Sequence, residues 1–188
     1  MTRRRERRLG RAAWLAFVLI AGDARADEGR RRFLEEHRCW IESALTSIHE
    51  RGPTTTSRDR YVTLSLDGDA QSYVQCIFQD DDTRMLCEAS SGAYRYGGSQ
   101  GMRLDMAAES VAALKALGFT QPDPKGNFVQ VVELGSPPRL GPVATLMLAS
   151  LHDAYHAEAT STLAWNAPMA AIDYTGCALA YVRIIRRK

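Results

Sequence analysis

Apolar and polar residues alternate most regularly between Tyr73 and Ser90, where two runs flank the acidic turn Asp80-Asp81-Asp82. Successive side chains of a strand point to opposite faces, so one face of each run would suit a core and the other would carry a mixed set. The apolar face comprises Val74, Cys76, Phe78, Met85, Cys87 and Ala89. This pattern predicts a β-hairpin at the centre of the fold.

Shorter alternating runs predict further strands at Tyr61–Leu66, Asn127–Leu134 and Thr162–Ala167. The first of them is joined to the hairpin by the turn sequence Asp67-Gly68-Asp69. Three consecutive antiparallel strands are therefore expected before the middle of the chain.

Apolar residues recur at helical spacing in three stretches, which predicts helices over roughly Glu28–His49, Asp105–Leu117 and Pro142–His156. Gly52-Pro53 and Gly118 follow the first two helices, and Pro142 suits the first turn of the third. The order α-β-β-β-α-β-α-β predicts an α+β fold, with an antiparallel sheet of about five strands and helices on one face. The pattern assigns no position to residues 169–188.

The N-terminal residues differ from the rest of the chain. Arginine-rich residues 1–11 precede an almost wholly apolar stretch, Ala12–Gly22, and then Ala24-Arg25-Ala26, which has the small-x-small form of a signal-peptidase site. We expect a cleaved signal peptide over 1–26, a domain over 27–168, a C-terminal extension over 169–188, and a periplasmic or secreted protein. An uncleaved anchor is the alternative, although the apolar stretch is shorter than the roughly 20 residues of a membrane span.

The chain carries 24 lysines and arginines and 22 acidic residues, but without residues 1–26 it has 17 basic and 20 acidic residues. The basic excess therefore belongs to the leader. A mature surface without that excess does not favour nucleic-acid binding.

Four cysteines, Cys39, Cys76, Cys87 and Cys177, follow the leader, an even number in a chain addressed to an oxidising compartment. Cys76 and Cys87 lie directly opposite each other if the hairpin turn is centred between Asp81 and Asp82. We therefore favour disulfides Cys76–Cys87 and Cys39–Cys177, with buried reduced thiols as the alternative.

Candidate chemistry is sparse. His152 and His156 have the i, i+4 spacing of a metal-binding pair, but the segment lacks the glutamate of HExxH, and Asp153 is expected to point elsewhere. Two exposed histidines near a helix C-terminus are the simpler interpretation. Asp80-Asp81-Asp82 is expected to be a solvated turn. The chain has no P-loop, and we interpret Gly97-Gly98-Ser99-Gln100-Gly101, which has the form GxSxG, as a plain surface loop, so we predict no cofactor and no catalytic residues.

Several ordered pieces of sequence carry a resemblance to a known family. They are Trp40 in the first helix, Tyr73-Val74-Gln75, Glu88 and Ser90, Leu117-Gly118-Phe119, Pro122, Asn127-Phe128, and Leu151 to Tyr155 before Leu163. Residues 33–168 resemble the Tir-chaperone-like (TY-Chap) domains, relatives of type III secretion chaperones and of YbjN-like proteins. The resemblance implies an α+β fold, frequent dimerisation, no catalysis and binding of a partner polypeptide.

The chain departs from the family in its leader, its four cysteines and its extension after Pro168. We therefore expect an exported, non-enzymatic module that holds a protein partner, or a second copy of itself, on the second face of the sheet. The partner-binding residues would be Tyr61, Thr63, Tyr73, Gln75, Ile77, Leu86 and Glu88. A solvated sheet face, a small metal-dependent hydrolase using His152 and His156, and a secreted inhibitor using the loop Ser91–Gly101 are the alternatives.

Overall fold

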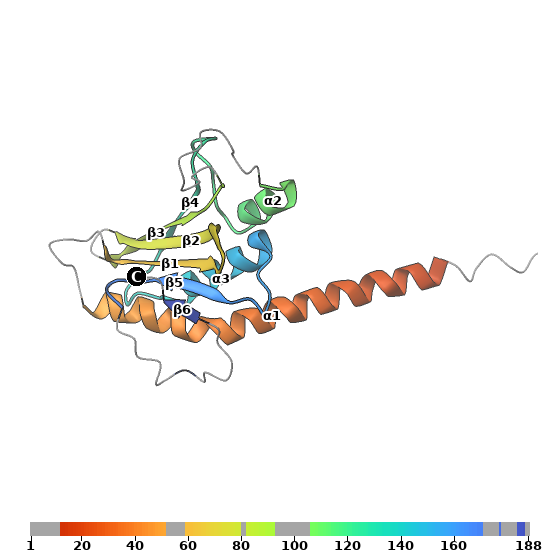
Figure 1. The fold of residues 1–188 in the computed structure, drawn as a ribbon, viewed down its shortest axis with the longest axis horizontal. Coiled ribbons are helices and arrows are strands. Elements are labelled where there is room, and N and C mark those ends of the chain that lie inside the picture. Colours follow the sequence, from red (N-terminus) through yellow and green to blue (C-terminus); the bar gives the residue numbers. More distant parts are fainter. Residues whose placement is uncertain are drawn as a thin grey trace, which may run out of the picture.

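A single sheet organises the molecule, and its strands alternate in the sequence with helices (Figure 1). The computed structural model describes residues 12–51, 59–79, 82–92, 106–170, 177 and 184–186. In chain order the elements are α1 (Ala12–Glu50), β1 (Tyr61–Leu66), β2 (Asp69–Gln79), β3 (Arg84–Ala89), α2 (Ala108–Ala116), β4 (Phe128–Glu133), α3 (Gly141–Tyr155), β5 (Leu163–Asn166) and β6 (Ile184–Arg186).

The strands are arranged in the order β4-β3-β2-β1-β5-β6. Neighbours are antiparallel from β4 to β5, whereas β6 pairs with β5 in parallel. The predicted α+β class, element order and five-stranded antiparallel sheet are confirmed. The short parallel strand β6, which comes from the segment that the pattern did not place, is an addition to them.

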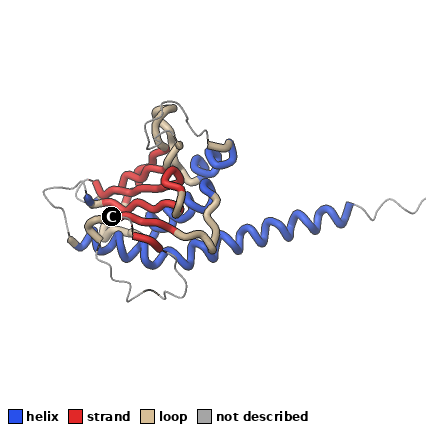
Figure 2. Tube along the Cα trace, viewed as in Figure 1, coloured by secondary structure: helices blue, strands red, loops and turns tan. Residues whose placement is uncertain are grey.

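The helices form the second layer of the fold. α1 and α3 pack against each other and against the strands, and α2 packs on α3. The strands lie in front of α3 in the view of Figure 2. The N-terminal part of α1 extends beyond the sheet (Figure 1). Among the described residues, none of the helices combines the length and the apolar character that crossing a membrane requires.

The core lies between these two layers. The apolar stripe of α1 is buried, and its residues Phe33, Trp40 and Ile48 are at most 1% exposed. Trp40 meets Trp165 of β5 edge to face, with ring centroids 5.5 Å apart. Full burial of each such large apolar side chain stabilises the fold by roughly 1.5–3 kcal/mol, so the spacing seen in the sequence fixes which side of α1 meets the sheet.

The central hairpin has the predicted register. Its apolar face is buried, and Cys76 is paired directly with Cys87, to which it is joined by a disulfide. A second disulfide joins Cys39 of α1 to Cys177 of the C-terminal segment. These are the two pairings that the sequence favours, and the described residues include no reduced cysteine.

Candidate functional site

The outer face of the sheet, turned away from α1 and α3, carries two rows of side chains that cross the strands. The apolar row consists of Tyr61, Ile77, Leu86 and Val131, which are successive register partners from β1 to β4. The mixed row beside it consists of Asn166, Thr63, Gln75, Glu88 and Val129. Six of the seven predicted partner-binding residues therefore lie in these rows, and Tyr73 lies one pair further along β2.

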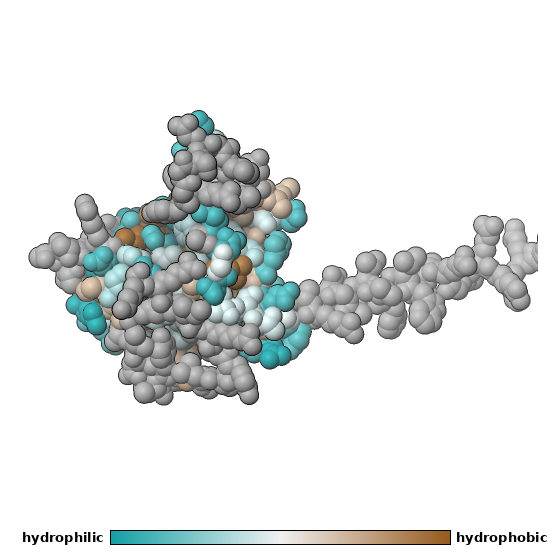
Figure 3. All heavy atoms as spheres, in the orientation of Figure 1, coloured by the Kyte–Doolittle hydropathy of each residue, from teal (hydrophilic) through white to brown (hydrophobic). Residues whose placement is uncertain are grey.

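The apolar row is partly accessible. Tyr61, Ile77 and Leu86 are half-buried, and Val131 is 48% exposed, the only large hydrophobic residue in the described ranges that is this exposed. In Figure 3, which has the same orientation, small hydrophobic areas interrupt a largely hydrophilic surface. Isolated apolar areas on a surface are ordinary, but the four residues of the apolar row are direct neighbours across four strands.

Polar residues of the outer face are partly occupied with one another. The Thr63 hydroxyl donates to Oε1 of Gln75 at 2.9 Å, and Nδ2 of Asn166 donates to the Tyr61 hydroxyl at 3.1 Å. Glu88 contributes a carboxylate to the mixed row. On the other side of the apolar row, Arg84 of β3 is the register partner of Glu133 of β4, so charges of both signs flank this row.

One end of this face is held by a hydrogen-bonded cluster. The Tyr155 hydroxyl of α3 donates to the Ser90 carbonyl at 2.6 Å, and Nδ2 of Asn127 donates to the Tyr73 hydroxyl at 2.8 Å. Asn127 also accepts from the Ser91 N–H at 3.2 Å. Burial raises the pKa of Tyr155, so its hydroxyl stays protonated and keeps donating.

This cluster includes two residues that the sequence places on the outer face. The hydroxyl of Tyr73, whose contact with a partner stays a prediction, joins β2 to the start of β4. Ser90 belongs to the same alternating set in the sequence, but it is only 2% exposed. Residues 93–105 lie outside the described residues, and with them most of the loop Ser91–Gly101 that was considered as an inhibitory loop.

Most of the sheet and two of the helices lie in a region that matches a known protein family. The family model TY-Chap3, described as T3SS (YopN, CesT) and YbjN peptide-binding chaperone 3, matches residues 53–169. The chain belongs to this family. The TY-Chap3 match covers β1 to β5, α2 and α3, and therefore both rows of the outer face. No curated protein and no solved structure matches the chain.

Members of this family are described as peptide-binding chaperones, so TY-Chap3 membership indicates a chaperone-like module with a protein partner. The pieces of sequence that carry the TY-Chap resemblance include Tyr73, Ser90, Asn127 and Tyr155. In the structure these four residues meet in the hydrogen-bonded cluster at the end of the outer face.

His152 and His156, the predicted metal-binding pair, have different surroundings in the structure. Nδ1 of His152 lies 2.8 Å from Oδ1 of Asp153, and Asp153 also accepts two-pronged hydrogen bonds from Arg30. The expectation that Asp153 points elsewhere is therefore wrong. His156 is exposed and ends α3 in a left-handed conformation, with φ 59°. Within the described ranges, no three His, Cys, Asp or Glu side chains gather into a metal site.

Of the acidic turn, Asp80 and Asp81 lie outside the described residues, and Asp82 is not solvated as expected. Asp82 is 7% exposed and pairs with the buried Arg60, while Nδ1 of His49 lies 3.0 Å from its Oδ2. Burial alone would raise the pKa of Asp82, but hydrogen bonds from Arg60 and His49 outweigh it and hold that pKa below its ordinary value. Asp82 therefore stays ionised and ties the hairpin turn to α1 and to the start of β1.

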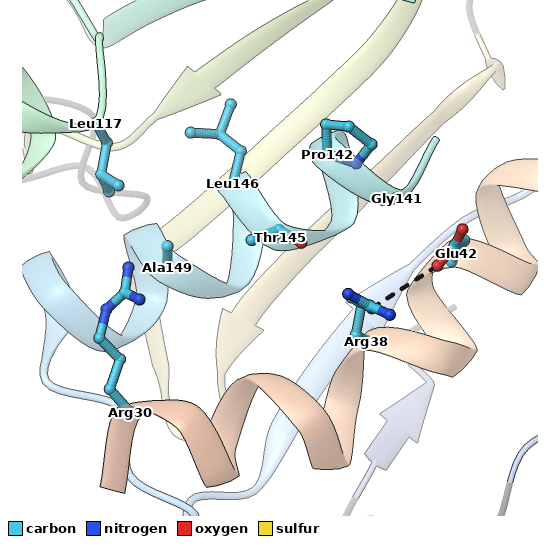
Figure 4. A pocket seen from close by; sticks show the side chains of 9 residues that line it. All are labelled: Arg30, Arg38, Glu42, Leu117, Gly141, Pro142, Thr145, Leu146 and Ala149. Atoms are coloured by element: carbon cyan, nitrogen blue, oxygen red, sulfur yellow. Dashed lines mark ion pairs between the residues drawn. The ribbon is translucent and has the colours of Figure 1, made fainter. Parts of the chain in front are cut away.

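A groove of about 530 Å³ lies on the opposite, helical side, between α1 and α3 (Figure 4). Its apolar lining includes Leu117, Leu146 and Ala149. On α1, Nε of Arg38 lies 3.9 Å from Oε2 of Glu42, one helical turn further along. The Glu42 carboxylate also lies beside Gly141, at the start of α3, where a negative charge is favoured.

Proposed function

We propose that this chain is a non-enzymatic chaperone-like module that binds an extended segment of a partner protein on the outer face of its sheet. The observation that carries the proposal is the apolar row of Tyr61, Ile77, Leu86 and Val131 beside the Glu88 carboxylate, within a domain of a peptide-binding family. An extended peptide turns alternate side chains to one side, and these side chains would contact the apolar row.

The dimensions of the apolar row suit a short extended peptide. Neighbouring strands are about 4.8 Å apart, so a row across four strands is about 14 Å long. Alternate side chains of an extended peptide lie about 7 Å apart, so three of them, from five consecutive residues, match this length. Glu88 flanks the row. The peptide residues between the apolar ones point away from the sheet, so basic residues there would be attracted to Glu88 at longer range and not through direct contact.

Peptide binding can be tested with a fluorescent peptide of alternating isoleucine and lysine, ended by serines, in anisotropy titrations. We expect the double variant Ile77→Ser/Leu86→Ser to bind at least about tenfold more weakly, since each substitution removes roughly 1 kcal/mol of apolar contact. Leu146→Ser is the matched control, because Leu146 is half-buried on the helical side. Equal losses in the control, or no loss in the double variant, would contradict the proposal.

The negative charge allows a second, independent test. Glu88→Lys should weaken the lysine peptide and strengthen a peptide in which glutamate replaces lysine, and both effects should shrink at high salt. Unchanged preference between the two peptides would show that Glu88 does not face the bound segment. Binding of a second copy instead of a peptide would appear as a concentration-dependent dimer.

We further propose that the chain is exported and acts in the periplasm or outside the cell. The leader-like residues 1–26 support this proposal, as does the pair of disulfides, because such bonds persist in oxidising compartments. Intact-mass measurement of the protein from a cell-envelope fraction, with thiol labelling, tests it. A mass that begins at Asp27 with four blocked thiols is expected, and a full-length mass with four reactive thiols would overturn the export proposal.

A further inference from the structure

The edge of β5 is covered by a strand from outside the family domain. The TY-Chap3 match ends at residue 169, and the chain continues to Lys188. Of this extension the structure describes Ala170, Cys177 and β6, and β6 pairs with β5 along its whole length of three residues. Within the matched region alone, β5 would be the edge strand of the sheet.

The pairing of β5 shows which of its backbone groups face β6. Thr162 accepts a hydrogen bond from the Asp67 N–H, so alternate residues from Thr162 onward face β1. Leu163 and Trp165 consequently turn their N–H and C=O groups toward β6. Ile185 is paired with Ala164, between these two residues, where its own N–H and C=O face theirs.

The covalent tether through Cys177 contributes more to holding β6 in place than the few backbone hydrogen bonds of so short a strand. A three-residue strand forms only a few backbone hydrogen bonds, each with a net contribution of about 1 kcal/mol. The disulfide from Cys39 fixes Cys177 against the domain, seven residues before Ile184. A short tether of this kind keeps the strand at an effective concentration in the millimolar range.

We propose that the edge of β5 is an acceptor site for an extended peptide strand, and that β6 occupies it in the intact, disulfide-bonded chain. The occupant indicates the chemistry of the external peptide: β-branched and aromatic residues followed by cations, as in Tyr181–Lys188 of this chain. The inference rests on the proposed function, because it assigns a second contact for the same class of partner and an internal competitor for it.

The test uses a fluorescent peptide with the sequence of residues 178–188 and three forms of the protein. These are the intact chain, a Cys39→Ser/Cys177→Ser variant, and a chain truncated after Ala180. Truncation removes the competitor, so the peptide should bind this form at least tenfold more tightly than the intact chain. With the disulfide, Ile184 is seven residues from its anchor at Cys177. Without it, the nearest anchor is Asn166 at the end of β5, 18 residues away, so the affinity for the peptide should rise by about fourfold at most.

A second variant guards against misfolding of the truncated chain. Ile185→Pro keeps the whole extension and both disulfides but removes the N–H that faces β5, so it should also bind the peptide more tightly than the intact chain. A control peptide with proline at the positions of Ile184 and Ile185 should not bind. If neither truncation nor Ile185→Pro increases affinity, the proposal is wrong.

Hydrogen exchange separates this proposal from the proposed function. Truncation should speed exchange of the Leu163 and Trp165 amides, and the added peptide should restore their protection. If the peptide instead protects only the strands beneath the apolar row, the outer face binds and the β5 edge does not. If the alternating peptide binds the outer face weakly or not at all while the residue 178–188 peptide protects β5, the outer-face function fails and the edge site stands.

Discussion

His37 shows how one side chain can link stability to pH. It is 2% exposed on α1, its Nδ1 lies 2.9 Å from the Phe33 carbonyl, and its Nε2 has no hydrogen-bond partner among the described residues. A carbonyl can only accept, so Nδ1 carries the proton and Nε2 presents a lone pair to the core. Burial lowers the pKa of His37, although the hydrogen bond to Phe33 opposes the effect.

The sign of the pH dependence follows from that lowered pKa. The unfolded chain takes up a proton at the ordinary histidine pKa near 6.5, before the folded chain does, so unfolding becomes easier as the pH falls below that value. Urea unfolding between pH 8 and 5 should show this loss, with a slope of up to about 1.4 kcal/mol per pH unit. In His37→Phe the slope should flatten, whereas the exposed control His156→Gln should keep it.

The carboxylates of Asp82 and Asp153 do not titrate between pH 5 and 8, the range of this experiment. The pKa of Asp82 and that of Asp153 are lowered below the ordinary value of 3.8, so the stability that they contribute is present above that value and is lost at more acidic pH. Equal slopes for the parent chain and His37→Phe would show that His37 does not titrate between the two states.

At the scale of elements, α1, β2 and the turn before β3 all contact a buried ion pair between Arg60 and Asp82. Arg60, which precedes β1, is 3% exposed and pairs with Asp82, and its Nη2 also donates to the Ile48 carbonyl of α1. Its guanidinium lies 5.1 Å from the centre of the Phe78 ring of β2. A charge removed from water in this way is stable only while its partner remains.

We therefore expect Asp82→Asn to lower the free energy of unfolding by about 3–5 kcal/mol, because it leaves the Arg60 charge buried and uncompensated. Asparagine tolerates the left-handed φ of 66° at this position, so backbone strain does not confound the result. Glu35→Gln, which breaks an exposed pair with Arg31, should cost far less than Asp82→Asn in the same denaturant experiment, because solvent screens an exposed pair. Similar losses in both variants would contradict the assignment.

The elements differ in how far the sequence predicts them. The hairpin and its Cys76–Cys87 pairing follow from a period-two pattern, and α3 follows from its apolar stripe, because local spacing decides both. The burial of Asp82 depends on Arg60, 22 residues away, and β6 is a three-residue strand held by a distant disulfide. No local pattern encodes such contacts. The outer face was predicted as a set of residues, but its division into two rows required the register.

At the scale of the whole molecule, the Cys39–Cys177 disulfide closes a loop that contains β1 to β5, with a sequence separation of 138. In the chain-entropy account, closing so long a loop in the unfolded state stabilises the fold by up to about 5 kcal/mol, and measured bonds commonly give about 2–4. Cys39→Ser/Cys177→Ser should lower the unfolding free energy by this amount in guanidinium titrations. A loss below about 1 kcal/mol would mean that the bond does not constrain the unfolded chain.

The same disulfide determines how the molecule bears tension. A pull on the two ends of the chain passes along α1 to Cys39, crosses the bond between the sulfur atoms to Cys177, and leaves through β6. The load bypasses the strands from β1 to β5 and both shorter helices, because they lie inside the covalent loop. Stretching could therefore fray the first part of α1 and peel β6 away from β5, while the rest of the domain stayed folded until the bond was reduced.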